Sequence, residues 1–199
     1  MKTRFLSSLL IIGLCACTTD EVTYDDTITS GWTAMSDQNF EAAFDHFSDA
    51  IDMDPDQAAG YAGLAWSLMY LDFLDQAAGT FIDGSTKTNP TADLYAGWAF
   101  TLSAKKSYSN SNTEITQALT LDANWSLFGQ SQLGLSVTDL HVCKAENHFL
   151  LGEFSQSLSE VKILNPSFAM TSVTTDSDKA NLAKEIQRLK GLSKAVHRR

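Results

Sequence analysis

Small and apolar residues recur in this chain at a fixed interval of 34 positions. The segment Tyr-Ala-Gly-Leu-Ala-Trp-Ser-Leu at 61–68 returns as Tyr-Ala-Gly-Trp-Ala-Phe-Thr-Leu at 95–102. A self-similarity of this length indicates a stack of repeated structural units. Four further sets keep their size class, or nearly so, at the same interval: Gly31, Ala65 and Ala99; Phe40, Leu74 and Tyr108; Phe47, Phe81 and Ile115; Ala50, Gly84 and Ala118.

Each unit predicts a pair of helices. Within one unit the apolar positions fall at helical spacing in two blocks, with small residues where neighbouring helices must come close. The three prolines, Pro55, Pro90 and Pro166, each follow Asp or Asn at the end of a unit, where proline can stop a helix without interrupting one. We therefore expect an all-α protein built from helix hairpins.

The repeat resembles the tetratricopeptide repeat (TPR), a 34-residue unit with aromatic, small and proline residues at set positions. That resemblance implies a right-handed α-α superhelix, with a TPR domain at 24–166 and repeats at about 24–57, 58–91 and 92–124. It also implies a degenerate fourth repeat at 138–166. The matching residues are Tyr61 and Tyr95; Gly31, Ala65 and Ala99; Ala43 and Ala77; Phe40 and Tyr108; Ala50 and Ala118; and Pro55.

Three segments depart from the pattern. Thr27 stands where the first unit should have an aromatic residue. Residues 107–112 are poor helix formers, Ser-Tyr-Ser-Asn-Ser-Asn, so we expect the second helix of the third unit to start late or to bulge. Residues 126–137 contain Gly and Ser and predict an inserted loop before the fourth unit, whose register the sequence leaves open.

The C-terminal part is expected to close the stack. Residues 167–176 form a polar linker, and residues 177–199 predict a helix whose apolar face carries Leu182, Ile186 and Leu189. Terminal units of a repeat stack need a polar outer side, which the Lys and Arg residues of this C-terminal capping helix can supply. A role at a membrane surface is the alternative, although the apolar face is narrow and lacks aromatic residues.

The N-terminus has the organisation of a secretory signal, with basic residues, an apolar stretch and a junction of small residues. The junction at 14–17, Leu-Cys-Ala-Cys, resembles the lipobox of bacterial lipoproteins. That resemblance implies a lipoprotein signal peptide at 1–16, a lipidated Cys17 and a short tether at 17–23. Ordinary signal cleavage, which leaves Cys17 as a thiol, is the alternative. The resemblance implies a lipid-anchored protein of the bacterial cell envelope. By the sorting rule of such lipoproteins, Thr18 rather than Asp after the cysteine implies the outer membrane, facing the periplasm.

The charge of the chain makes nucleic acid a poor candidate partner. Lys and Arg total 14 against 24 Asp and Glu, a net charge of −10, and removal of residues 1–16 would leave −12. Such a charge favours basic partners. Apolar residues make up 44% of the chain, which favours a folded protein, and no stretch after residue 17 is long and apolar enough to span a membrane.

Sequence motifs of enzymes are mostly absent. The chain has no Gly-rich phosphate loop, no His-Glu-x-x-His, no Gly-x-Ser-x-Gly and no paired-cysteine metal spacing. His141, Cys143, Glu146 and His148 crowd one segment, but a shared metal would need ligands from other helices. We expect no enzyme activity, no cofactor and no metal, and keep a metal-dependent enzyme that uses this cluster as a minor hypothesis.

A set of large residues recurs one position beyond the small packing residues. In TPR proteins the corresponding face of each first helix lines the concave groove, so the resemblance implies a partner-binding groove here. Aromatic and Met side chains are common anchors in interfaces. The alternative is that these residues only cover the core between the first helices. The candidate groove residues are Trp32, Met35, Trp66, Met69, Tyr70 and Phe100.

The resemblance leads to one main hypothesis of function and one alternative. The main hypothesis is a membrane-anchored, non-catalytic scaffold that binds a peptide or protein partner of the cell envelope in its concave groove. The alternative is a glycan-binding or peptidoglycan-binding lipoprotein, in which the row of Trp32, Trp66 and Phe100 stacks on sugar rings.

Overall fold

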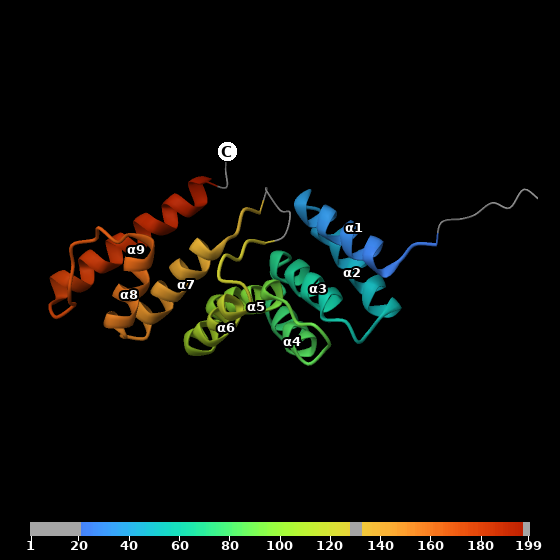
Figure 1. The fold of residues 1–199 in the computed structure, drawn as a ribbon, viewed down its shortest axis with the longest axis horizontal. Helices are drawn as coiled ribbons and strands as arrows, with labels where there is room; N and C mark the ends of the chain where they lie inside the picture. The colour runs from blue at the N-terminus through green and yellow to red at the C-terminus, as the bar shows by residue number, and fades with distance from the viewer. Residues whose placement is uncertain (1–20, 128–132, 197–199) are drawn as a thin grey trace, which may run out of the picture.

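A computed structural model describes residues 21–127 and 133–196 of the protein (Figure 1). The signal peptide expected at 1–16 and the candidate lipidation site Cys17 lie outside the described residues. Within these two ranges the chain forms helices and no strand, apart from isolated β-bridges between Gln57 and Thr88 and between Ser126 and Ser136. The helices are α1 (Tyr24–Ser36), α2 (Phe40–Met53), α3 (Ala58–Tyr70), α4 (Leu74–Ser85), α5 (Ala92–Ala104), α6 (Tyr108–Leu121), α7 (Val137–Leu150), α8 (Phe154–Leu164) and α9 (Asp176–Val196).

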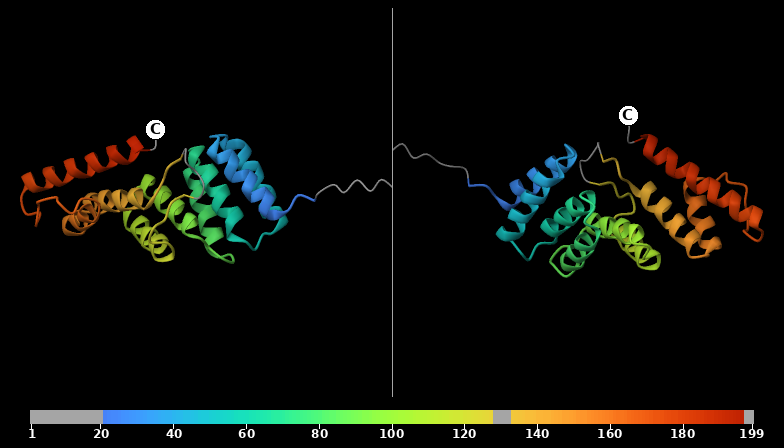
Figure 2. Two further views of the ribbon diagram at one scale, coloured as in Figure 1. Left: turned by 45° about the horizontal axis from the view of Figure 1, so that its top comes forward. Right: turned by 180° about the vertical axis from the view of Figure 1, so that it is seen from behind.

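The helices pack as consecutive pairs. α1 packs on α2, α3 on α4, α5 on α6 and α7 on α8, while α9 lies against both α7 and α8. The first helices of successive pairs are also neighbours, in the order α1, α3, α5 and α7. The stack forms an arc whose two ends rise on the side away from α4 and α6 (Figures 1 and 2). The predicted all-α stack of helix hairpins is thereby confirmed.

The 34-residue interval corresponds to a close contact between helices that repeats along the stack. A Cβ atom added to Gly31 or Gly63 would lie 2.6 or 2.2 Å from the ring of Phe47. A Cβ atom on Gly97 would lie 2.5 Å from the ring of Phe81. Each ring therefore lies directly against the backbone of a first helix, an approach that only glycine permits.

The turn inside each helix pair repeats as well. Gln38, Asp72 and Lys106 follow the first helices at the 34-residue interval, and their φ angles are 58°, 65° and 63°. Gly152 takes the same place in the fourth pair, with a φ of 78°. A left-handed residue just after a helix is a common way to end it. Gly152 follows Lys106 by 46 positions instead of 34, so the fourth pair is the same unit displaced by an insertion.

A buried hydrogen bond confirms this register of the fourth pair. Ser111 Oγ in α6 donates to the carbonyl oxygen of Ala99 in α5 at 2.7 Å. Ser157 Oγ in α8 donates to the carbonyl oxygen of Ala145 in α7, also at 2.7 Å. Both bonds join the second helix of a pair to the first at equivalent positions. The insertion lies in residues 122–136, between α6 and α7.

The expectation that the second helix of the third unit starts late or bulges is wrong. α6 begins at Tyr108, in register with Phe40 at the start of α2 and Leu74 at the start of α4. The polar residues in its first turns have partners, since Asn147 Nδ2 donates to Ser111 Oγ at 2.9 Å and to Asn112 Oδ1 at 3.0 Å. Side chains that are paired in this way do not compete with the helix backbone for its own hydrogen bonds.

Buried side chains form two clusters. The larger one extends from α1 to α7 and includes Phe47, Trp66 and Phe81. None of the described helices is long and apolar enough to cross a membrane. The smaller cluster joins α9 to α7 and α8 through Val142, Ala145, Leu158, Val161, Leu182, Ile186 and Leu189.

Candidate functional site

Aromatic rings form a continuous row through the stack. The rings of Phe40 and Tyr70 are stacked with centroids 4.7 Å apart, and Tyr70 lies 6.1 Å from Trp66. The row continues from Trp66 to Phe100 at 6.2 Å and from Phe100 to Trp125 at 6.3 Å. Trp125 does not belong to a helix but to the inserted segment, whose described residues, 122–127 and 133–136, lie on the inner side of the arc (Figure 1).

The predicted groove residues belong to one cluster, but three of them are buried. Trp66 and Met35 have no exposed surface, and Trp32 is 9% exposed. In this conformation the side chains of Trp66 and Met35 cannot contact a partner, so the assignment of these two to a groove lining is corrected to a place in the core. The three partly buried groove candidates that pack against the cluster are Met69, Tyr70 and Phe100.

The inserted segment packs on the same cluster. Trp125 and Leu127 are 1% and 4% exposed and join the same cluster as Trp66. Leu133 and Leu135, on the returning part of the segment, pack against that cluster as well. The sequence predicted a plain loop here. Its apolar residues at alternate positions, 125 and 127, then 133 and 135, are a strand-like pattern that could have shown a buried face.

Asp93, in the first turn of α5, fastens Trp125 to the stack. Its Oδ1 atom accepts a hydrogen bond from Trp125 Nε1 at 2.7 Å, and its backbone carbonyl accepts one from Trp66 Nε1 at 2.9 Å. Burial raises the pKa of the Asp93 carboxyl, although the hydrogen bond from Trp125 acts in the opposite direction. Asp93 thus binds the indole rings of both Trp66 and Trp125.

Tyr70 and Asp139 interact electrostatically although they belong to different helix pairs. Burial raises the pKa of Tyr70 to about 12, and the carboxylate of Asp139 adds to this rise. Tyr70 is the last residue of α3, whereas Asp139 is in the first turn of α7.

An open cavity of about 210 Å³ remains between α5, α7 and α9. Its apolar wall is formed by Phe100, Leu135, Val142 and Cys143, and Ser103 completes it. Burial raises the pKa of the Cys143 thiol, which keeps it protonated at neutral pH. The charged groups at the cavity are Asp139, Glu146 and Lys190, and Lys190 Nζ lies 2.6 Å from Glu146 Oε2.

A network of polar side chains joins the third pair to α7. Asn147, which has no exposed surface, lies at its centre. Ser103 Oγ donates to Asn147 Oδ1 at 2.8 Å, and the Asn147 amide donates to Ser111 and Asn112. The amide therefore uses both its oxygen and its nitrogen, and the contact between α5, α6 and α7 depends on hydrogen bonds as well as on apolar packing.

The two histidines of the candidate metal cluster have different partners. His141 Nδ1 lies 2.7 Å from Glu160 Oε2, and His148 Nδ1 lies 2.6 Å from Glu153 Oε2. Burial alone would raise the pKa of Glu160, but the neighbouring His141 and Lys144 hold it below its usual value. Among the residues that the structure describes, no group of three or more His, Cys, Asp or Glu side chains is arranged to hold a metal.

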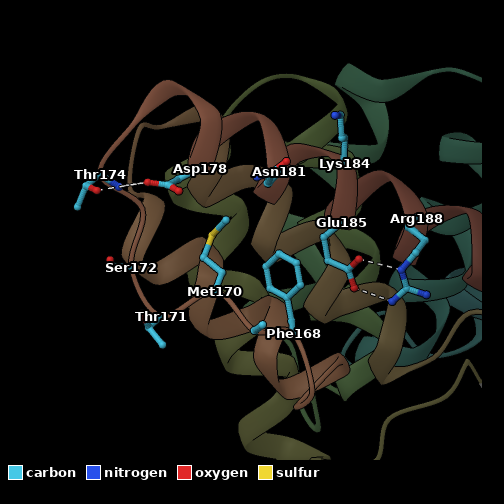
Figure 3. Close-up of a pocket in the computed structure, with 11 residues that line it drawn as sticks. Phe168, Met170, Thr171, Ser172, Thr174, Asp178, Asn181, Lys184, Glu185 and Arg188 are labelled. Carbon is cyan, nitrogen blue, oxygen red and sulfur yellow. Dashed lines mark hydrogen bonds and ion pairs between the residues drawn. The ribbon is translucent and has the colours of Figure 1, made fainter.

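A second hollow lies at the end of the stack, between the linker after α8 and helix α9. It has a volume of about 820 Å³ and is wide open to solvent. Figure 3 shows Phe168 and Met170 beside each other in this hollow, with the Glu185 and Arg188 side chains paired on its wall. The Glu185 carboxylate also accepts a hydrogen bond from Asn165 Nδ2 at 2.7 Å. These charged groups serve to fix the linker on α9.

Comparison with known proteins identifies the fold. No protein-family model matches the chain, and no curated protein matches it. Among solved structures, it is similar to TTC0263, a thermophilic TPR protein of Thermus thermophilus, with 13% identity and a TM-score of 0.57 over 83% of this chain and 82% of that one. It is also similar to YrrB, described as a TPR protein with an unusual peptide-binding site, with 13% identity and a TM-score of 0.60 over 89% and 88% of the two chains.

A further similar structure is that of MamA, with 11% identity and a TM-score of 0.58 over 83% of this chain and 96% of that one. Likeness at such low identity concerns the fold alone. Together with the repeated helix pairs, it shows that the protein has a fold of the TPR type.

Proposed function

We propose that the protein is a non-catalytic scaffold that binds a peptide or protein partner on the inner side of its helix stack. The observation that carries this proposal is the cavity between α5, α7 and α9, which combines an apolar wall with the ion pair of Glu146 and Lys190. An apolar side chain fits such a cavity, and a Lys or Arg beside it would compete with Lys190 for the Glu146 carboxylate. The net charge of −10 would also draw basic partners toward the protein.

The similar structures support the same kind of partner. YrrB, by its description, has a peptide-binding site, and its fold is similar to that of this chain over most of both lengths. The identity of 13% does not transfer a site from one protein to the other. The proposal for this chain therefore rests on its own cavity and charge.

A charge reversal at the cavity tests the binding proposal. Glu146→Lys should abolish capture of the partner in cross-linking of intact cells, because it replaces a carboxylate that would face a basic segment. The matched control is Asp49→Lys, which makes the same change of charge on an exposed position of α2. Equal capture by both variants would contradict the proposal, provided that circular dichroism shows both folded.

We also propose that the scaffold is attached to the cell envelope through a lipid on Cys17, in the outer membrane of a bacterium. The support is the sequence at 14–17 alone. Cys17→Ser should move the protein from the membrane fraction to the soluble fraction and prevent incorporation of labelled palmitate. Retention of the variant in the membrane fraction would show that the attachment is different.

The glycan-binding alternative has no support from the positions of its residues. Stacking on a sugar requires an exposed ring face, and the central ring of the proposed ladder, Trp66, has no exposed surface. Trp32 is 9% exposed, and its ring packs edge-on against Phe47 at 5.2 Å. The aromatic row therefore serves packing rather than a sugar platform.

A further inference from the structure

The inserted segment between α6 and α7 is attached to the helix stack in an unusual way. Leu127 N–H donates to Leu135 O at 2.9 Å within the segment, whereas Val137 N–H, the first of α7, donates to Trp125 O at 2.7 Å. Ser126 and Ser136 form the antiparallel bridge between these two bonds. Ser136 O also accepts from the N–H groups of Asp139 and Leu140 and stays with α7, so release of Trp125 and Leu127 would cost α7 one backbone hydrogen bond, that of Val137.

Side chains and the bond from Val137 N–H of α7 hold this ladder on the inner side of the arc. The Trp125 ring lies 6.3 Å from that of Phe100, and its Nε1 atom donates to Asp93 Oδ1 at 2.7 Å. Leu127 is 4% exposed within the same cluster. Extended peptides bound to proteins likewise place alternate side chains in pockets, and here one side-chain hydrogen bond and the Val137 bond take the place of a full main-chain ladder.

The surface beneath the ladder has the properties of a binding groove that is already occupied. It consists of Phe100 on α5, with the Asp93 carboxylate at one end and the open cavity at the other. Leu135 of the ladder forms one wall of that cavity, so a partner entering the cavity must meet the ladder first.

We propose that residues 122–127 and 133–136 are an intramolecular ligand of the inner surface, and that a partner binds by replacing Trp125 and Leu127. The proposal rests on the proposed scaffold function and specifies its partner. That partner is an extended segment with a tryptophan, or another ring that carries a hydrogen-bond donor, two positions before an apolar residue. Its ring donates to Asp93, and the segment continues past Phe100 into the cavity.

Hydrogen exchange of the unmodified chain gives the first test. The amide protons of Leu127 and Val137 should exchange at least about 100-fold faster than those in the middle of α5, because the ladder opens without unfolding of the stack. If they exchange as slowly as the α5 amides, the ladder is a permanent part of the core and the proposal is wrong. This measurement decides the question even where a variant fails to fold.

A peptide added to the protein gives the second test. The double variant Trp125→Ala/Leu127→Ala should bind a synthetic, labelled peptide of residues 122–136 in fluorescence anisotropy. The wild-type chain should bind it at least about tenfold more weakly, because its own segment competes at a high effective concentration. The control peptide carries the same two alanines and should bind neither protein. Failure of a folded double variant to bind the native peptide overturns the proposal.

The two proposals can fail separately. If the peptide binds the double variant but Glu146→Lys leaves capture of the cellular partner unchanged, the intramolecular ligand stands and the scaffold function at the cavity fails. If Glu146→Lys abolishes capture but the peptide does not bind, the scaffold function stands and the ladder is only structural.

Discussion

Two junctions between neighbouring helix pairs are stabilised in different ways. At the junction of the second and third pairs, Trp66 fills the space left by Gly97, and apolar packing is joined by a hydrogen bond from Trp66 to the Asp93 carbonyl and an exposed ion pair of Lys105 with Asp75. At the junction of the third and fourth pairs, Asn147 makes hydrogen bonds to Ser103, Ser111 and Asn112. The inserted segment lies at this second junction.

The difference shows that junctions between similar helix pairs can differ in how easily they separate. An apolar junction gains stability from buried area and tolerates no separation, because parting exposes aromatic rings to water. A polar junction is held by a few directed bonds, which water can replace when the helices part. Separation of the third pair from the fourth should therefore cost less stability than separation of the second from the third. The proposed binding cavity lies at this second junction.

Trp66→Ala should cause the largest loss of stability. The indole is fully buried and donates to the carbonyl of Asp93, so its removal leaves a cavity and loses this hydrogen bond. Truncation of a buried aromatic residue typically costs about 3–5 kcal/mol. Urea denaturation followed by circular dichroism measures the loss. A change below about 1 kcal/mol would show that the first junction is not the stronger one.

Gly97→Ala should act at the same junction through overpacking. The new Cβ atom would lie 2.5 Å from Phe81 and 2.6 Å from Trp66, and neither ring has free space to move into. We expect a loss of about 2–3 kcal/mol in the free energy of unfolding. Gly79→Ala is the control, since its Cβ meets nothing within 4 Å in the exposed part of α4, and it should stabilise the protein by about 0.5–1 kcal/mol.

The first junction is also the part that the sequence predicts best. The 34-residue interval arises from contacts such as those of Phe47 and Phe81 with glycine, which recur because each pair must pack on the next in the same way. The pattern therefore predicts helix pairs and their order. It does not show whether a large residue next to the small ones, such as Trp66, faces solvent or is covered.

The non-periodic part of the chain could not be predicted in the same way. The covering segment occurs once, so no comparison between repeats can reveal what Trp125 contacts, and its partner Asp93 is far away along the chain. The sequence also predicts the start of α6 wrongly, for a related reason. Ser111 and Asn112 are unfavourable in an isolated helix, and their partners come from other helices: Asn147 of α7 for both, and the Ala99 carbonyl of α5 for Ser111.

Asn147→Ala should weaken the second junction. It removes one hydrogen-bond partner each of Ser103, Ser111 and Asn112, at a cost of about 2 kcal/mol, although Ser111 keeps its bond to the Ala99 carbonyl. Asn110→Ala is the control, since Asn110 is exposed and its side chain donates to Ser107, within its own helix turn. If the second junction is the weaker one, Asn147→Ala should also speed exchange of the Leu127 amide more than Gly97→Ala does.

Asp93→Asn should change the free energy of unfolding least of the four variants. The pH dependence of this change shows whether it comes from burial of the Asp93 carboxylate. Burial raises the pKa of Asp93 in the folded protein above its unfolded value, so the folded state binds the proton more tightly. The stability that comes from this group is therefore fully present below the unfolded pKa, of about 3.9, and is lost as the pH rises through the folded pKa.

An asparagine carries no charge and keeps an oxygen that can accept the Trp125 bond. The variant should match the wild type in strong acid and become more stable than it toward neutral pH, as measured by urea denaturation across that range. A constant difference at every pH would mean that the carboxylate is as well solvated in the folded protein as in the unfolded chain, and that the contact between Asp93 and Trp125 does not shield it from water.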